Sequence, residues 1–165
     1  MKNRLTISIF LIVIILSLSG CNGNKQAELK IIIGNTNVNY KVLKDETSAD
    51  LFKFAFGEAD KYIEYVDIGE KVFLDFGDNP PDQIIINDHL LNSQGDPMYT
   101  EKEIFDVPVI GDNKRYYFVV NKNLASGLSS HYEENKKDFR GFTVFATKGE
   151  INKVYLFVIK TDGLF

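Results

Sequence analysis

Short segments rich in β-branched and aromatic residues run from Leu29 to the end of the chain and limit what it can fold into. Gly, Asn, Asp and Pro separate them, and these residues favour turns, whereas Val, Ile, Phe and Tyr favour strands. Within 71–76, Val72, Leu74 and Phe76 recur at every second position, so they share one face of an extended chain. The pattern predicts an all-β domain.

Ten segments have the length and composition of strands. They are Leu29–Ile33, Asn39–Leu43, Leu51–Phe56, Tyr62–Ile68, Lys71–Phe76, Gln83–Asn87, Phe105–Ile110, Arg115–Asn121, Gly141–Thr147 and Lys153–Lys160. The last two contain nearly continuous apolar runs, which predicts central strands with both faces partly covered. The glycine-containing link Lys148–Asn152 between them has the length of a hairpin loop, which favours antiparallel pairing.

Two segments are open to a second interpretation. Ser48–Ala59 also has the pattern of an amphipathic helix capped by Thr47 or Ser48, and Ala125–Asn135 fits either a short helix or a loop. Many short strands in one domain predict an antiparallel two-sheet sandwich, with a closed barrel as the alternative. The segment Lys71–Phe118 resembles the early strands of extracellular immunoglobulin-like modules, which implies the same architecture and no particular activity.

The first 21 residues have the pattern of an export signal. Lys2 and Arg4 precede an apolar run from Leu5 to Leu16, which suits a signal-peptide helix and is too short to span a bilayer. Leu18-Ser19-Gly20-Cys21 resembles the lipobox of bacterial lipoproteins. This resemblance implies that a diacylglycerol is attached to Cys21 and that the chain is cleaved before it. The ending Tyr155–Asp162 is similar to that of small uncharacterised lipoproteins of Bacillus-like Gram-positive bacteria.

We therefore expect a signal peptide at 1–20, a lipidated polar tether at 21–28 and a β-sandwich domain at 29–165. The domain is expected on the extracytoplasmic face of the cell membrane. Without residues 1–20 the chain has 17 basic and 23 acidic side chains, a net charge of −6. This acidic balance argues against nucleic-acid binding. Cys21 is the only cysteine, so no internal disulfide is possible and the core alone must stabilise the domain.

Catalytic and metal motifs are weak. Gly127-Leu128-Ser129-Ser130-His131 begins like a nucleophile elbow, but histidine occupies the position of the second glycine. His89 and His131, with Asp88 as a third ligand, are the best candidates for a metal site, yet no spacing motif joins them. We expect no cofactor and no metal.

The densest basic cluster, Lys136, Lys137 and Arg140, lies next to Phe139 and Phe142 and is the best candidate surface for an acidic partner, with His131 close in sequence. The sequence thus favours a monomeric, non-catalytic lipoprotein, not an enzyme, that binds an envelope protein or a cell-wall component. Two alternatives remain open. One is a small envelope hydrolase or metal-binding protein using His131 and His89. The other is a protease-inhibitor-like module that presents Leu91–Tyr99.

Overall fold

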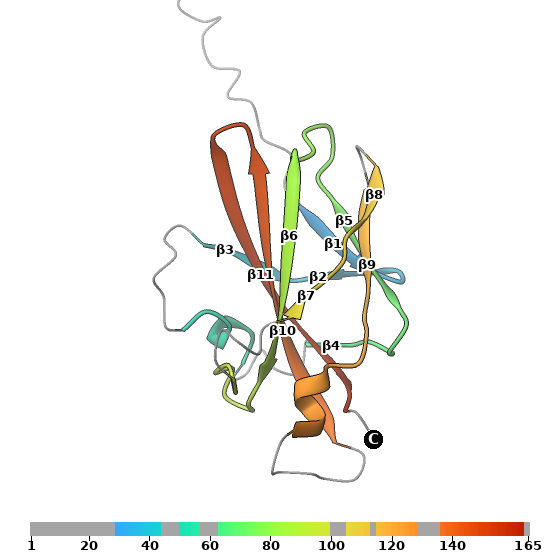
Figure 1. Cartoon of the computed structure of the whole chain (residues 1–165), viewed down its shortest axis with the longest axis vertical. Coiled ribbons are helices and arrows are strands. Elements are labelled where there is room, and N and C mark those ends of the chain that lie inside the picture. Colours follow the sequence, from blue (N-terminus) through green and yellow to red (C-terminus); the bar gives the residue numbers. More distant parts are fainter. Residues whose placement is uncertain are drawn as a thin grey trace, which may run out of the picture.

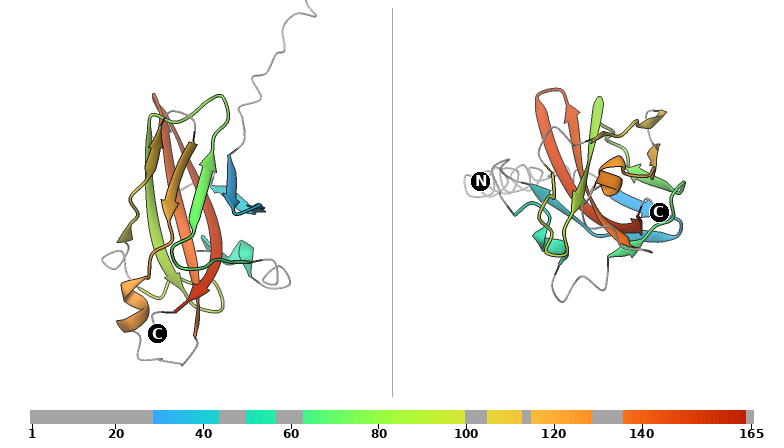
Figure 2. Two further views of the ribbon diagram at one scale, coloured as in Figure 1. Left: turned by 90° about the vertical axis from the view of Figure 1, so that its right-hand side faces the viewer. Right: turned by 60° about the horizontal axis from the view of Figure 1, so that its bottom comes forward.

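The computed structural model describes residues 29–43, 50–56, 63–99, 105–112, 115–128 and 136–163. Within them, two sheets face each other across a hydrophobic core, as Figures 1 and 2 show from three directions. The predicted all-β antiparallel sandwich is therefore confirmed. The alternative of a closed barrel is wrong, because no strand pairing joins the two sheets in the described part of the chain.

The five-stranded sheet has the order β2-β1-β5-β9-β8. Its strands are β2 (Thr36–Val38), β1 (Lys30–Ile33), β5 (Lys71–Asp75), β9 (Arg115–Val119) and β8 (Ile110–Asp112). All of its pairs are antiparallel, and Leu74 at its centre lies opposite Ile31 on one side and Tyr116 on the other. The alternation seen in 71–76 therefore sets which face of β5 meets the core.

The six-stranded sheet has the path β3-β11-β10-β6-β7, with β4 as a further partner of β11. Its strands are β3 (Tyr40–Leu43), β11 (Ile151–Asp162), β10 (Lys137–Lys148), β6 (Gln83–Leu91), β7 (Phe105–Asp106) and β4 (Glu64–Tyr65). β4 pairs with β11 in parallel, and the other pairs are antiparallel. β10 and β11 occupy the middle of the sheet, as the sequence predicts, and the turn Gly149–Glu150 joins them.

Most of the predicted strands coincide with observed ones, and the differences have local causes. β6, β10 and β11 extend further than predicted because polar residues such as Asp88 and Arg140 continue them. The single strand predicted at 105–110 is wrong: β7 and β8 lie there in different sheets, separated at Pro108, which cannot donate a ladder hydrogen bond. The strand predicted at 62–68 is reduced to the two residues of β4, and β2 is too short to show alternation.

The strand predicted at Leu51–Phe56 is wrong. Within 50–56 only a short 3-10 helix, η1 (Lys53–Ala55), is present, and the flanking residues 50–52 and 56 form turns and bends. The alternative of an amphipathic helix is therefore also wrong over 50–56, and the rest of its predicted range, 48–49 and 57–59, lies outside the described residues. A second 3-10 helix, η4 (Leu124–Leu128), occupies the start of the segment for which a short helix or a loop was expected, and residues 129–135 are likewise not described.

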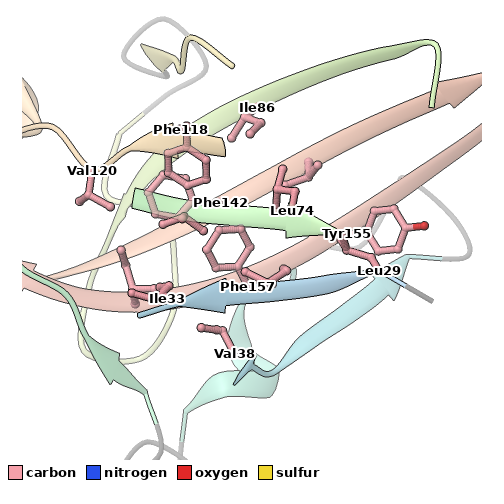
Figure 3. Packing of buried hydrophobic residues seen from close by; sticks show 14 of the residues in the cluster. Leu29, Ile33, Val38, Leu74, Ile86, Phe118, Val120, Phe142, Tyr155 and Phe157 are labelled. Carbon is pink, nitrogen blue, oxygen red and sulfur yellow. The ribbon is translucent and has the colours of Figure 1, made fainter. Parts of the chain in front are cut away.

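The main core lies between the two sheets. Figure 3 shows its aromatic centre, in which the rings of Phe142 and Phe157 stack with centroids 5.0 Å apart and Phe118 of the opposite sheet lies 5.1 Å from Phe142. Leu29, at the start of the described chain, is already part of this core and is only 1% exposed.

A smaller core covers the outer face of the six-stranded sheet. Phe52, beside η1, packs there with Leu91, Val154, Leu156 and Val158. Gly141 makes this contact possible, because a Cβ at that position would lie 2.8 Å from the Phe52 ring and 2.9 Å from Leu91 Cδ1. β10 and β11 are thus covered on both faces, as their continuous apolar runs predict.

Candidate functional site

The three cations of the predicted binding cluster do not form one surface. Lys137 and Arg140 are an odd number of residues apart on β10, so their side chains leave opposite faces of the sheet. Lys137 is exposed on the outer face, whereas Arg140 points between the sheets and its side chain is 3% exposed. The fold therefore removes Arg140 from any contact with a large partner.

Arg140 is the centre of a buried polar network. Its Nε donates to Asp88 Oδ1 at 2.9 Å, its Nη2 pairs with Asp88 Oδ2, and its Nη1 donates to the carbonyl of Asn121 at 2.9 Å. The Nδ2 of Asn123 donates to Asp88 Oδ2 at 3.1 Å. Both oxygens of Asp88 thus accept hydrogen bonds, which compensates the cost of burying two charges.

The network fastens the segment after β9 to the sheet. Asn123 Oδ1 accepts a hydrogen bond from the backbone N–H of Ala125 at 2.9 Å, within η4, and the carbonyl of Ala125 accepts one from the Tyr99 hydroxyl at 3.0 Å. Two loops that lie far apart in sequence are therefore held together at one end of the sandwich. Leu124 is 66% exposed on the resulting surface.

Lys136 and Asp138 form a second, incomplete buried pair. Lys136 Nζ lies 3.8 Å from Asp138 Oδ1, too far for a hydrogen bond, and neither buried atom has a hydrogen-bond partner in the described structure. Thr161 lies opposite Asp138 on β11 and is fully buried. Lys136 and Asp138 attract each other without a hydrogen bond between them. We therefore expect this pair to fix the positions of its side chains less firmly than the Arg140 network does.

Lys137 takes part in a surface cluster at the end of β10. Its ammonium pairs with the Asp162 carboxylate and lies 4.6 Å from the centroid of the Tyr65 ring. The hydrogen bond to Asp162 raises the pKa of Lys137, and the same bond is the largest cause of the lowered pKa of Asp162. The positive charge of Lys137 is thus already matched by a neighbouring carboxylate, which weakens its attraction for an acidic partner.

His89 lies on the outer face of the six-stranded sheet, beside Phe52. Its Nε2 forms a 3.1 Å hydrogen bond with Thr143 Oγ1, and its ring centroid lies 5.2 Å from that of Phe52. Asp88 and His89 are consecutive residues of one strand and face opposite ways, so Asp88 is wrong as a third metal ligand beside His89. Among the described residues, no three His, Cys, Asp and Glu side chains are placed to hold a metal ion.

The environment of His89 makes a prediction about pH. Burial lowers the pKa of His89 below its ordinary value of 6.5, more strongly than the charge of Asp88 raises it. Between the lowered pKa and pH 6.5, the unfolded chain therefore binds more protons than the folded one. The contribution of His89 to the free energy of unfolding is complete above pH 6.5 and is lost as the pH falls through this interval. We expect His89→Gln to remove this part of the pH dependence of the free energy of unfolding.

Urea denaturation followed by circular dichroism at about pH 7.5 and about pH 5.5 measures the effect, because most carboxyl groups keep their charge in that interval. His131→Gln is the matched control, since it removes the other histidine. Equal slopes in the wild type and His89→Gln would contradict the prediction.

The other sequence-predicted residues, Cys21, Ser129, Ser130 and His131, lie outside the described residues. The described surface includes an open groove and a small hollow. The groove, of about 460 Å³, runs along the start of β1 and the crossing from β2 to β3, lined in part by Leu29, Val38, Tyr40 and Val42. The hollow, beside Phe76, Pro81 and Tyr155, has a volume of about 30 Å³, which suits little more than a water molecule.

Comparisons with known proteins assign no family. No protein-family model, no curated protein and no solved structure matches this chain. In the described part of the chain, no helix has the length and apolar character needed to cross a bilayer.

Proposed function

We propose that this protein is a lipid-anchored, non-catalytic binding module at the extracytoplasmic face of the cell membrane. The observation that carries the proposal is the spacing between the lipobox-like cysteine and the packed domain. Leu29 is already buried in the core, only eight residues after Cys21, and the intervening residues are polar. A chain of this length spans about 15 Å on average, so a lipid on Cys21 holds the sandwich close to the bilayer.

The non-catalytic part of the proposal is supported by how the charged side chains are used. Asp88 and Arg140 are hydrogen-bonded to each other and to Asn123 and Asn121, and these bonds hold the segment after β9 in place. His89 is engaged by Thr143 on a face that Phe52 covers. The alternative of a hydrolase or metal protein depends on His131, which lies outside the described residues.

The surface that we propose for binding is the end of the sandwich formed by η4 and the loop containing Tyr99. The Tyr99–Ala125 and Asn123–Ala125 hydrogen bonds hold this surface in one shape, and a preformed surface binds a partner at a lower entropic cost. Loops positioned by a rigid scaffold are the usual recognition elements of sandwiches. An envelope protein or a cell-wall component is the proposed partner.

Cys21→Ala tests the anchor. We expect cells fed an alkyne-labelled fatty acid to label the wild type and not Cys21→Ala, and we expect the variant to leave the membrane fraction or to remain uncleaved. Ser17→Ala is the matched control, because it leaves Leu18–Cys21 intact and is expected to be labelled. Label on the Cys21→Ala protein, or its cleavage and retention in the membrane pellet, would disprove the lipoprotein assignment.

A further inference from the structure

The tip of the β10–β11 hairpin is a fixed, partly apolar projection. Ile151 follows the turn directly and is 56% exposed. The link between β5 and β6 holds this turn, because the backbone N–H of Gly149 donates to Asp82 Oδ2 at 2.9 Å and the Lys148 ammonium bonds to Asn79 Oδ1. Ile151 is therefore presented on a braced turn instead of a loose loop.

The hairpin tip lies at the same end of the sandwich as the start of the described chain. Figure 3 shows Leu29 beside Tyr155 of β11, and both belong to the main core. Lys30 lies opposite Asp75, the last residue of β5. The ring of the next residue, Phe76, packs against the Tyr155 ring with the two centroids 6.1 Å apart. In Figures 1 and 2 the β10–β11 turn and the link between β5 and β6 lie together at this end, opposite η4.

The length of the tether fits the height of the tip. Tyr155 lies at the level of Leu29, and Ile151 is four residue steps away from it, which corresponds to about 13 Å along a strand. The eight residue steps from Cys21 to Leu29 span about 15 Å on average. A sandwich held by a lipid on Cys21 therefore has its hairpin tip at about the depth of the membrane surface when its long axis stands upright.

We propose that the β10–β11 tip rests on the lipid surface, with Ile151 inserted among the headgroups. This inference rests on the proposed lipid anchor and adds an orientation to it. Val42 on β3 is also exposed, but it lies opposite Tyr155, at the level of Leu29, so Ile151 is the apolar side chain that reaches the lipid. Isolated side chains of this kind insert shallowly, at the boundary between headgroups and acyl chains. Leu124 on η4 then faces away from the membrane, toward a partner.

The test uses the mature lipidated protein, which begins at Cys21, reconstituted into vesicles of phosphatidylglycerol and phosphatidylethanolamine. Once Cys21 is acylated, a cysteine introduced by Ile151→Cys is the only thiol and takes an environment-sensitive dye. Asn152→Cys, exposed at the same tip, provides a second position, and Leu124→Cys at the other end is the matched control. Lipids that bear a quencher on the acyl chain report the proximity of each dye to the bilayer.

We expect all three proteins to float with the vesicles, and we expect quenching at 151 and 152 to be several-fold stronger than at 124. Flotation with equal quenching at both ends, or with stronger quenching at 124, would overturn the proposed orientation and leave the anchor in place. Failure of the unlabelled wild type to float would overturn the anchor and this inference together. Burial of the 151 dye against a second copy of the protein would appear as a blue-shifted spectrum without quenching by lipid, which also overturns the proposal.

Discussion

Arg140→Met is expected to lower the free energy of unfolding by about 3–5 kcal/mol, because it leaves the Asp88 carboxylate buried without its cation. Methionine fills most of the volume of the arginine stem, so loss of packing makes a small contribution. The remaining partner of Asp88 is the amide of Asn123, at 3.1 Å, and a single neutral donor does not compensate a buried charge. Urea denaturation followed by far-ultraviolet circular dichroism measures the loss.

Two controls separate the buried charge from other effects. Lys137→Met makes the same substitution on the opposite, exposed face of β10 and is expected to change stability little. The double variant Asp88→Leu with Arg140→Met replaces both charges by apolar side chains and is expected to recover most of the loss. Equal stabilities of Arg140→Met and Lys137→Met would show that Asp88 is solvated in the folded protein, contrary to its burial.

Phe52→Ala is expected to cost about 3–5 kcal/mol, the usual range for removing a fully buried phenylalanine ring. Phe52 is the fully buried side chain by which the segment 50–56 packs on β10 and β11, and its ring lies on Gly141. Phe56 adds a second contact, with its ring centroid 5.0 Å from that of Phe139. Removal of the Phe52 ring exposes Leu156 and Val158 as well as leaving a cavity. Hydrogen exchange is expected to show the loss of protection first in this segment, with the core between the sheets less affected.

Gly141→Ala provides the matched test of this contact. In the wild type the new Cβ lies within 3.0 Å of Phe52 and Leu91, so overpacking is expected to cost about 1–3 kcal/mol. In the Phe52→Ala background the ring is absent, and the same substitution is expected to be much less harmful. The two changes should therefore be non-additive, with a coupling of about 0.5–3 kcal/mol. Strict additivity would mean that the ring does not rest on Gly141.

The sequence predicts the sheets well where hydrophobic pattern and burial agree. The alternation in 71–76 identifies the core face of β5, and the continuous runs at 142–146 and 154–159 identify the strands covered on both faces. The glycine-containing link at 148–152 predicts their antiparallel pairing. These features depend on neighbours in sequence, so a local pattern is enough to find them.

The sequence predicts less well where distant residues decide the outcome. Leu51–Phe56 is apolar enough for a strand. Its conformation depends instead on the packing of Phe52 against Gly141, which lies about 90 residues later in the chain. The basic cluster at 136–140 was wrongly predicted to form one surface for a similar reason. Arg140 pairs with Asp88 between the sheets, and Asp88 lies about 50 residues earlier in the chain. One signal was available: Arg140 has the same strand parity as the buried Phe142 and Val144, which predicts an inward-facing cation and hence a buried acid.

The position of β11 in the chain has a consequence for how the protein comes to be folded. β3 and β4 both pair with β11, although they precede it by about 100 residues, and in the described part of the chain neither has another strand partner. A chain is synthesised from its N-terminus, so β3 and β4 cannot form these pairs until residues 151–162 have been synthesised. The six-stranded sheet is therefore completed only after translation has passed Asp162. Before that moment the growing polypeptide is without its sandwich and can still be threaded through a narrow channel.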